Sequence, residues 1–234
     1  MPTFDAVSRR GFTAASLALL AGCRLNKLPE YHSRLHKAFL VVDVAQPGTV
    51  DVGGSPDRAT DEKKGLVAAA ASIAEGIIGL KLQGRLREVM PQGRVSELIG
   101  EVMIARMPEI ELEHVSLKEM PDTRMEFQVN SFGIRSASDL EPVSYHFDFR
   151  TLLVYEPEGK KIWRFSRQLG APISDVHVAA WSNSAVGDIS NAVALDNLET
   201  AELEAVMVAM VQDATNLFMD QLAYDFYKAK MGRR

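Results

Sequence analysis

Hydrophobic and polar residues alternate with a period of two through much of the middle of the chain. This period is typical of strands that bury one face. It predicts strands at residues 110–117, 124–136, 144–155 and 161–166. The inward face expected for the third of these consists of Tyr145, Phe147, Phe149, Thr151 and Leu153. Because the last three strands follow one another through short connections, we predict an antiparallel meander.

Apolar residues recur at helical spacing in three other stretches. They lie at 66–80, with Ile77 and Leu80 on the expected inward face, at 94–103, and from Asp196 onward. Shorter helical pieces are expected at 174–187 and from 188. The terminal helix has the longest predicted apolar face, made of Leu203, Val206, Met207, Met210, Ala214, Leu217 and Phe218. Acidic residues near its start and basic residues at its end suit the helix dipole.

A nearly continuous apolar run from Lys37 to Val44 predicts one more strand, buried near the middle of its sheet. The fold class that follows is α+β. We expect an antiparallel sheet of about four to five strands backed by helices, with a long C-terminal helix. Residues 37–234 are expected to form a single domain, which is within the usual size range.

The N-terminus reads as an export signal and is therefore set apart from the fold. Arg9 and Arg10 precede an apolar run at 12–20, which has about half of the ~20 residues that a spanning helix needs. The run ends in Leu20-Ala21-Gly22-Cys23, which resembles the bacterial lipobox. That resemblance implies cleavage after residue 22, a diacylglyceryl thioether on Cys23 and acylation of its new amino group. The alternative is a core helix that contains the chain's one cysteine.

The same segment also indicates the export pathway and the membrane in which the protein is anchored. Ser8-Arg9-Arg10-Gly11-Phe12 resembles a twin-arginine export motif, although Thr13 stands where such signals often have Leu. Export by the Sec route remains the alternative. Arg24 follows the cysteine where Asp would favour retention at the inner membrane, so we expect the outer membrane, periplasmic side. The inner membrane and the cell surface stay open. Residues 23–36, interrupted by Pro29, are expected to form a lipidated tether.

Charge and motif content narrow the possible partners. The chain has a net charge of −5 and would be slightly more acidic without residues 1–22. An acidic chain is poorly suited to nucleic acid, whose binding depends on phosphate neutralisation. The sequence has neither a dinucleotide-binding glycine motif nor a Walker lysine, so no cofactor is expected. The expected contact with the membrane is the covalent lipid at Cys23.

The histidines do not form a recognisable catalytic or metal motif. His32 and His36 are four residues apart but lack the glutamate of a zincin motif, so no metal is expected. His146, Asp148 and Arg150 share one strand face, with Arg164 as a neighbour across the hairpin. A hydrolase would have to bring Ser144 or Ser166 to His146 and Asp148. Charge pairing on an exposed face is the simpler interpretation, so we predict no catalytic residues and a protein that is not an enzyme.

Methionine is frequent in the predicted helices and strands. A methionine-rich groove between the sheet and its helices would accept an acyl chain or a partner helix. The simpler interpretation is that these flexible side chains fill gaps in the core. The side chains concerned are Met90, Met103, Met107, Met120, Met125, Met207, Met210 and Met219.

The segment from Tyr145 to Tyr155, with Gly159-Lys160 and Trp163 after it, resembles the strand-turn-strand of small envelope lipoproteins. The stretch from Glu204 to Leu222 is similar to their closing amphipathic helix. The likeness is to the LPS-assembly lipoprotein and to lipoproteins that assist envelope transporters. It implies a partner-binding plug or adaptor. We therefore expect a membrane-anchored, non-catalytic binding, assembly or transport-accessory module with an envelope protein as partner. The alternatives are an exported hydrolase and a lipid-binding carrier.

Overall fold

The computed structural model describes residues 25–51, 77–135, 143–173 and 196–232. Within these ranges, six strands form one mixed sheet in the order β3-β1-β4-β5-β6, with β2 beside β4. The strands are β1 (Lys37–Val44), β2 (Thr49–Asp51), β3 (Glu113–His114), β4 (Thr123–Arg135), β5 (Ser144–Tyr155) and β6 (Lys160–Pro172). The α+β class is therefore confirmed. The sheet is larger than the four to five strands expected and is not wholly antiparallel.

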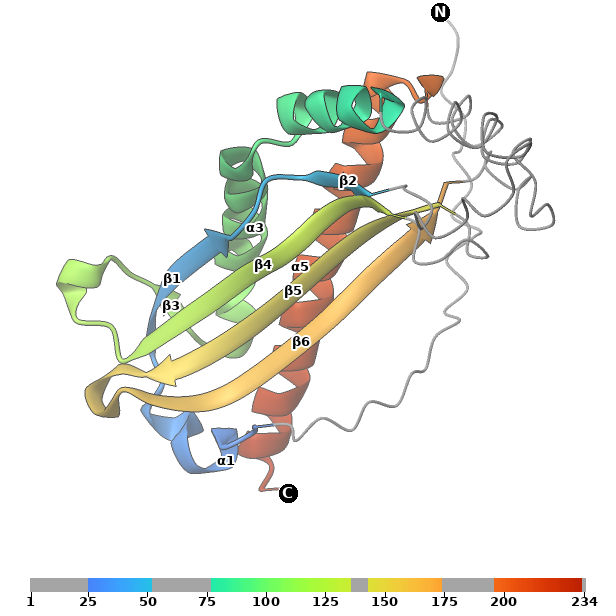
Figure 1. Cartoon of the computed structure of the whole chain (residues 1–234). Coiled ribbons are helices and arrows are strands. Elements are labelled where there is room, and N and C mark those ends of the chain that lie inside the picture. The colour runs from blue at the N-terminus through green and yellow to red at the C-terminus, as the bar shows by residue number, and fades with distance from the viewer. Residues whose placement is uncertain (1–24, 52–76, 136–142, 174–195, 233–234) are drawn as a thin grey trace, which may run out of the picture.

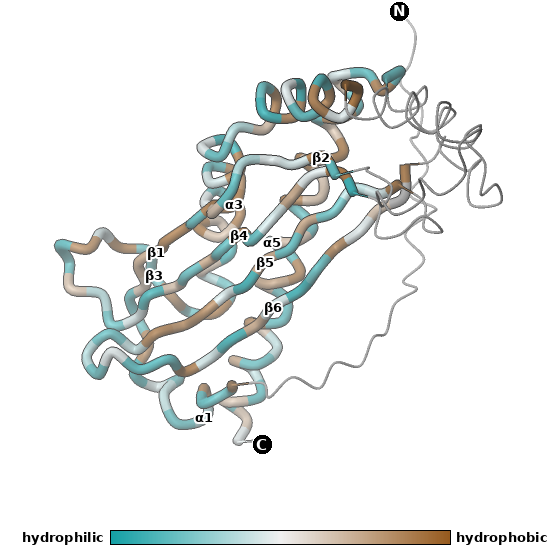
Figure 2. Tube along the Cα trace, in the orientation of Figure 1, coloured by the Kyte–Doolittle hydropathy of each residue, from teal (hydrophilic) through white to brown (hydrophobic). Residues whose placement is uncertain are grey.

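The meander β4–β5–β6 is confirmed, with antiparallel pairing along nearly the whole of each strand. The side chains predicted to point inward from β5 are all buried. Figure 2 shows a hydrophobic stretch of β5 leading into the hairpin with β6. There Leu152 and Val154, on the opposite face from Leu153, are buried as well. The hairpin closes through η5 (Glu156–Glu158) and Gly159, whose φ of 60° is left-handed and suits glycine.

The parallel strands are the part of the sheet that the sequence patterns missed. β1 and β2 both run parallel to β4, β1 along residues 123–129 and β2 along residues 133–135. Helical segments intervene between these strands and β4, as parallel pairing requires. β1 is not central: its other neighbour is the two-residue β3, and only Ala38 and Val44 of its side chains are buried.

One glycine permits the close approach of β2 to β4. Gly133 has a φ of 139°, and a Cβ built on it would lie 1.9 Å from the carbonyl oxygen of Thr49. A side chain at this position would therefore collide with backbone. The ladder between β4 and β5 is also irregular between Val129 and Ser131, close to where β1 gives way to β2.

Two long helices, α3 (Gln92–Arg106) and α5 (Thr200–Lys230), lie behind the sheet in the view of Figure 1. α5 starts at Thr200, later than the Asp196 expected. Of its predicted inward residues, Val206 is half-buried and Leu217 is 38 % exposed, while the other five are buried. The buried residues of α3 are Val95, Leu98, Ile99 and Met103. These were expected to face inward, whereas Val102, also expected there, is half-buried.

Residues 77–89 are also helical, but they present a different face from the one predicted. Ile77 and Leu80 are 62 % and 72 % exposed, whereas Leu82 and Leu86 are buried. The stretch at 66–76 and the short helices expected at 174–187 and from 188 to 195 lie outside the described residues. The predicted strand at 110–117 is mostly absent. It is replaced by η3 (Met107–Ile110), the short β3 and η4 (Leu117–Glu119).

The core between the sheet and α5 is built from aromatic rings. Phe127 of β4 stacks on Phe149 of β5 with ring centroids 5.1 Å apart, and Phe218 of α5 meets Phe127 edge-on at 5.8 Å. Trp163 of β6 lies 5.8 Å from Phe218 and is fully buried. Such ring pairs add about 0.5–1.5 kcal/mol each beyond the area they bury.

Candidate functional site

The residues predicted to carry the anchor lie outside the described part of the chain. These are Arg9, Arg10, Leu20, Ala21, Gly22 and Cys23. The lipobox and the twin-arginine motif therefore stay predictions. The structure does describe the residues that follow Cys23 almost directly, from Leu25 onward.

Residues 25–36, defined here as the N-terminal segment, pack on the fold and do not form the tether that was expected. α1 (Leu28–Tyr31) and η1 (His32–Arg34) lie within it. Leu28, Tyr31 and Leu35 are at most 5 % exposed. The reason is long-range: these three apolar side chains join the main core, which a local pattern around Pro29 does not show. The described fold therefore begins at Leu25 and not at Lys37.

Backbone hydrogen bonds attach the start of the N-terminal segment to β6. The amide of Lys27 donates to the carbonyl of Ile162 at 2.7 Å, and the amide of Arg164 donates to the carbonyl of Leu25 at 3.0 Å. Asn26 forms an isolated antiparallel bridge with Trp163 between them. Residues 25–27 thus extend the sheet beyond β6 for a short distance.

Polar contacts join Tyr31 to the β5–β6 hairpin. Its hydroxyl donates to Glu158 Oε2 at 2.8 Å and accepts from Lys160 Nζ at 2.6 Å. This hydrogen bond with Tyr31 raises the pKa of Lys160 above its usual value. The Lys160 ammonium also lies 5.0 Å from the centre of the Tyr31 ring. The hairpin and the N-terminal segment therefore hold each other in place.

Trp163 links the N-terminal segment to the end of α5. Its indole Nε1 donates to Asp225 Oδ2 at 2.8 Å, and both residues are buried. Trp163 lies in the core. Sequence reasoning overlooked its partner Asp225. The available signal was a carboxylate at helical spacing from Phe218, Leu222 and Ala229, on the apolar face of the predicted helix.

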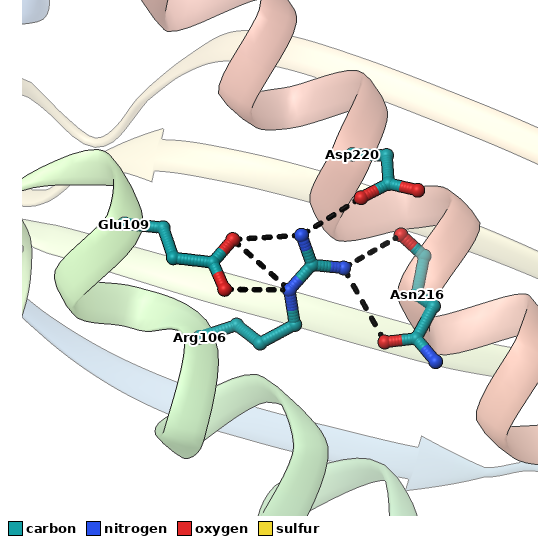
Figure 3. A network of polar contacts seen from close by, with 4 residues as sticks. All are labelled: Arg106, Glu109, Asn216 and Asp220. Atoms are coloured by element: carbon teal, nitrogen blue, oxygen red, sulfur yellow. Dashed lines mark hydrogen bonds and ion pairs between the residues drawn. The ribbon is translucent and has the colours of Figure 1, made fainter.

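Figure 3 shows a second polar cluster, in which Arg106 at the end of α3 contacts three residues. Its guanidinium donates to Glu109 and to Asp220, in each case at a shortest distance of 2.7 Å, and to Asn216 Oδ1 at 3.3 Å. The hydrogen bond to Glu109, the largest cause, raises the pKa of Arg106. The same bond lowers the pKa of Glu109. The cluster fixes α3 against α5 and has no nucleophile, so we assign it a structural role.

The strand face that carries His146, Asp148 and Arg150 does not have the arrangement that a hydrolase needs. The three residues follow one another along β5, and no hydrogen bond joins His146 to Asp148 among the described residues. Ser166 lies opposite Arg150, well away from His146. Ser144 is in the same strand, two residues before His146. Arg164 lies opposite Leu152, and so only diagonally from Arg150. The side chains are therefore spread along the strand.

His146 is not part of an exposed charged surface, as was expected, because it is only 4 % exposed. Burial, with a contribution from the nearby charge of Arg135, lowers its pKa to about 4, so the ring is neutral at pH 7. Its Nδ1 has no hydrogen-bond partner among the described residues. Asp148 and Arg150 are half-buried. We therefore interpret His146 as a structural residue and not as a general base.

The packing of the core also does not support the lipid-carrier alternative. Phe127, Phe149, Trp163 and Phe218 fill the space between the meander and α5. Of the eight methionines considered, Met120 is 86 % exposed and the others are buried in the core. This favours gap filling over a methionine-rich groove. Among these eight, Met120, beside η4, is the one left on the surface.

The described residues contain neither a metal-binding cluster nor a helix that could cross a membrane. In the described ranges, no group of three or more His, Cys, Asp or Glu side chains is arranged to hold a metal ion. His32 begins η1 while His36 follows the extended Leu35, so the two imidazoles do not share a helix face. None of the described helices combines the length and the hydropathy that crossing a bilayer would take.

Comparisons with known proteins do not identify a family. No protein-family model matches the chain, and no curated protein matches it. Among solved structures, XCC0632 from Xanthomonas campestris, of the family DUF330, is 11 % identical with a TM-score of 0.36. The match covers 80 % of this chain and 88 % of that one.

Two further solved structures match with lower TM-scores. Lipoprotein GNA1162 from Neisseria meningitidis is 18 % identical over 65 % of this chain and 91 % of its own, with a TM-score of 0.24. The PelC dodecamer from Paraburkholderia phytofirmans gives 9 % identity, 71 % and 90 % coverage, and a TM-score of 0.26. At these TM-scores, the likenesses carry no inference about fold or function. The functional argument therefore depends on the chain itself.

Proposed function

We propose that the chain is a lipid-anchored lipoprotein of the bacterial envelope that acts as a non-catalytic binding, assembly or transport-accessory module. Residues 1–22 are a cleaved export signal, and Cys23 carries the lipid. Arg24 directs the protein to the outer membrane, where the domain faces the periplasm. Its partner is another envelope protein, with a lipid ligand as the alternative. Nucleic acid is not among its partners.

The observation that carries this proposal is the spacing between the lipobox and the fold. Leu20-Ala21-Gly22-Cys23 ends two residues before Leu25, whose carbonyl oxygen is already hydrogen-bonded to β6. Cleavage before Cys23 would therefore remove the apolar run and leave the packed N-terminal segment intact.

Lipid attachment is also sufficient for a lasting membrane association. Each buried methylene contributes about 0.8 kcal/mol, and a single myristoyl chain binds only marginally. A diacylglyceryl group plus an amide-linked acyl chain supplies two or three long chains. The domain would then need no spanning helix and no strong attraction of its own to remain at the bilayer.

The non-catalytic assignment rests on the site geometry. His146 is buried and neutral, and Asp148 and Ser166 are displaced from it along the sheet. The exported hydrolase keeps one possible observation in its favour, the unpaired His146 Nδ1. If His146→Gln abolished a hydrolytic activity of the purified protein without unfolding it, the non-catalytic proposal would be wrong.

The anchor is tested by Cys23→Ala expressed in bacterial cells. Wild type should sediment with the membranes and incorporate labelled palmitate, whereas Cys23→Ala should do neither. Ser33→Ala, an exposed change in η1, is the matched control and should behave as wild type. Retention of Cys23→Ala in the membrane fraction would contradict the lipid anchor.

The route and the destination have separate tests. Replacing Arg9 and Arg10 together by Lys should block export through the twin-arginine route, whereas a Sec signal tolerates Lys. Arg24→Asp should move the protein from the outer to the inner membrane fraction.

Crosslinking in cells, with the Cys23→Ala form as the unanchored control, should identify an envelope protein that is captured only by the anchored form.

A further inference from the structure

The last turns of α5, together with Met231 directly after its end, expose a group of apolar side chains on one side of the helix. Tyr224, Tyr227 and Met231 are 52 %, 59 % and 52 % exposed. Their spacing of three and four residues places them, with Lys228, on one side of the helix. We call these four residues the terminal stripe. Most other large apolar residues of α5 are buried, so the terminal stripe is the part of the helix that lacks a covering layer among the described residues.

The N-terminal segment brings the proposed anchor to this end of α5. Figure 1 shows α1 beside the C-terminal end of the helix. Asn26 pairs with Trp163, and the indole of Trp163 reaches Asp225, which is adjacent in sequence to Tyr224. Cys23 is only two residues from Leu25, so their Cα atoms are at most about 8 Å apart. A lipid on Cys23 would therefore enter the bilayer close to the terminal stripe.

The chemistry of the terminal stripe suits a lipid surface with anionic headgroups. Tyrosine combines an apolar ring with a polar hydroxyl and is enriched where a bilayer meets water. The Lys228 ammonium lies 4.4 Å from the centre of the Tyr224 ring. Lys230, two residues later, is paired with Glu111 at 2.7 Å. Asp220, the nearest acid on this side of the helix, is paired with Arg106 at 2.7 Å. The terminal stripe itself therefore carries one positive charge, that of Lys228, although the chain as a whole is acidic.

We infer that the terminal stripe of α5 lies on the bilayer in which the Cys23 lipid is inserted, an inference that rests on the anchor proposed above. The two attachments hold the domain in one orientation. The C-terminal end of α5 and the β5–β6 hairpin side face the membrane. The opposite end of the sheet, with β2, projects away from the lipid and towards partners.

The experiment uses the full chain, lipidated in cells and reconstituted into vesicles of phosphatidylethanolamine and phosphatidylglycerol. In this protein the Cys23 thiol is consumed by the lipid, so Tyr224→Cys or Tyr227→Cys adds the one reactive thiol for a nitroxide label. Asp213→Cys is the matched control. It is exposed on the same side of α5, about 16 Å further from the C-terminus than Tyr224. Collisions of each label with oxygen, which partitions into lipid, are compared with collisions with a water-soluble nickel complex.

Labels at 224 and 227 should be severalfold more accessible to oxygen than to the nickel complex, and the label at 213 should show the reverse. In the unlipidated Cys23→Ser background, the label at 224 should become as accessible to water as that at 213. Three outcomes would overturn the inference. A reactive Cys23 thiol in wild type removes the anchor and the docking together. A blocked Cys23 with a water-exposed label at 224 removes the docking alone. A label shielded from both reagents means that protein, not lipid, covers the terminal stripe.

Discussion

The meander β4–β6 and the N-terminal segment 25–36 are held to the fold by different means. Each strand of the meander pairs with its neighbour along nearly its full length, and its inner face supplies the stacked rings of Phe127 and Phe149. The N-terminal segment contains one four-residue helix. It is held by the side chains of Leu28, Tyr31 and Leu35 and by short contacts with β6.

The two regions should therefore have different roles. The meander determines the stability of the domain, and the N-terminal segment determines where the domain lies relative to the lipid. The meander should open only with the whole domain, because its hydrogen bonds and core contacts are shared among strands. The N-terminal segment depends on a few side chains, and such regions open at a lower free energy. Under the proposed anchor, the weaker region is the one that connects the lipid to the domain. Its packing would then decide how closely the domain is held to the bilayer.

The largest effect should come from removing the ring that joins the meander to α5. Phe218→Ala leaves a cavity between Phe127 and Trp163 and should reduce the free energy of unfolding by about 3–5 kcal/mol. Urea denaturation followed by circular dichroism measures this loss. Leu217→Ala, one residue earlier and 38 % exposed, should cost less than about 1 kcal/mol. Equal losses for the two variants would mean that Phe218 is not a core residue.

A smaller but still clear effect should follow from Leu28→Ala in the N-terminal segment. Leu28 is fully buried, so its truncation should cost about 2–4 kcal/mol if the segment unfolds with the domain. Glu30→Ala, on the exposed side of α1, is the control and should be nearly neutral. If the segment were a tether, both variants would match wild type. A loss in Leu28→Ala that appears only as faster local amide exchange would show that the segment opens separately.

The sequence predicted the structure where local pattern and burial agree. The period of two in β5 identified Phe147, Phe149 and Leu153 correctly, because each strand of the meander meets its partner through a short hairpin or loop. Parallel pairing of β1 and β2 with β4 has no local signature, since it depends on a connection through helices. The periodicity around Ile77 and Leu80 correctly predicted a helix, but the face predicted to be buried was the wrong one. Helical spacing alone does not specify which side meets the sheet.

The candidate site was predicted less completely than the fold. Cys23 was predicted from a motif that lies outside the described residues, so it stays a prediction; the described packing begins at Leu25. Asp225 was missed because a carboxylate at the end of a helix resembles ordinary surface charge until Trp163 is placed opposite it. His146 was assigned to an exposed face because strand alternation gives the side of a residue. Alternation does not show what covers that side.

His146 gives the third prediction, a pH dependence located in the meander. Its folded-state pKa of about 4 is below the 6.5 of an unfolded histidine, so the unfolded chain binds more protons between these values. Stability should therefore fall as the pH is lowered from 6.5 towards 4, by roughly 2 kcal/mol once partial solvation is allowed for. His146→Gln should flatten this part of the curve, and His114→Gln, at an exposed position, should not. Parallel curves for wild type and His146→Gln would contradict the neutral buried imidazole.

The smallest predicted effect concerns the hydrogen bond through which the two regions meet at α5. Trp163 belongs to the meander, pairs with Asn26 of the N-terminal segment and donates to Asp225. Because Asp225 has further interactions, single substitutions would overstate the free energy that this one hydrogen bond contributes. A double-mutant cycle of Trp163→Phe and Asp225→Asn isolates it and should give a coupling of about 1.5 kcal/mol, typical of a bond to a charged group.

The same cycle can show whether the bond supports one region or both. Trp163→Phe should speed hydrogen exchange at the amides of Lys27 and Arg164, which pair the N-terminal segment with β6, more than at amides in the β4–β5 ladder. This follows because the segment is attached at the position where Trp163 is replaced, whereas β4 and β5 retain their own pairing. Uniform acceleration across the sheet would mean that the two regions open as one unit. The N-terminal segment would then be as firmly held as the meander.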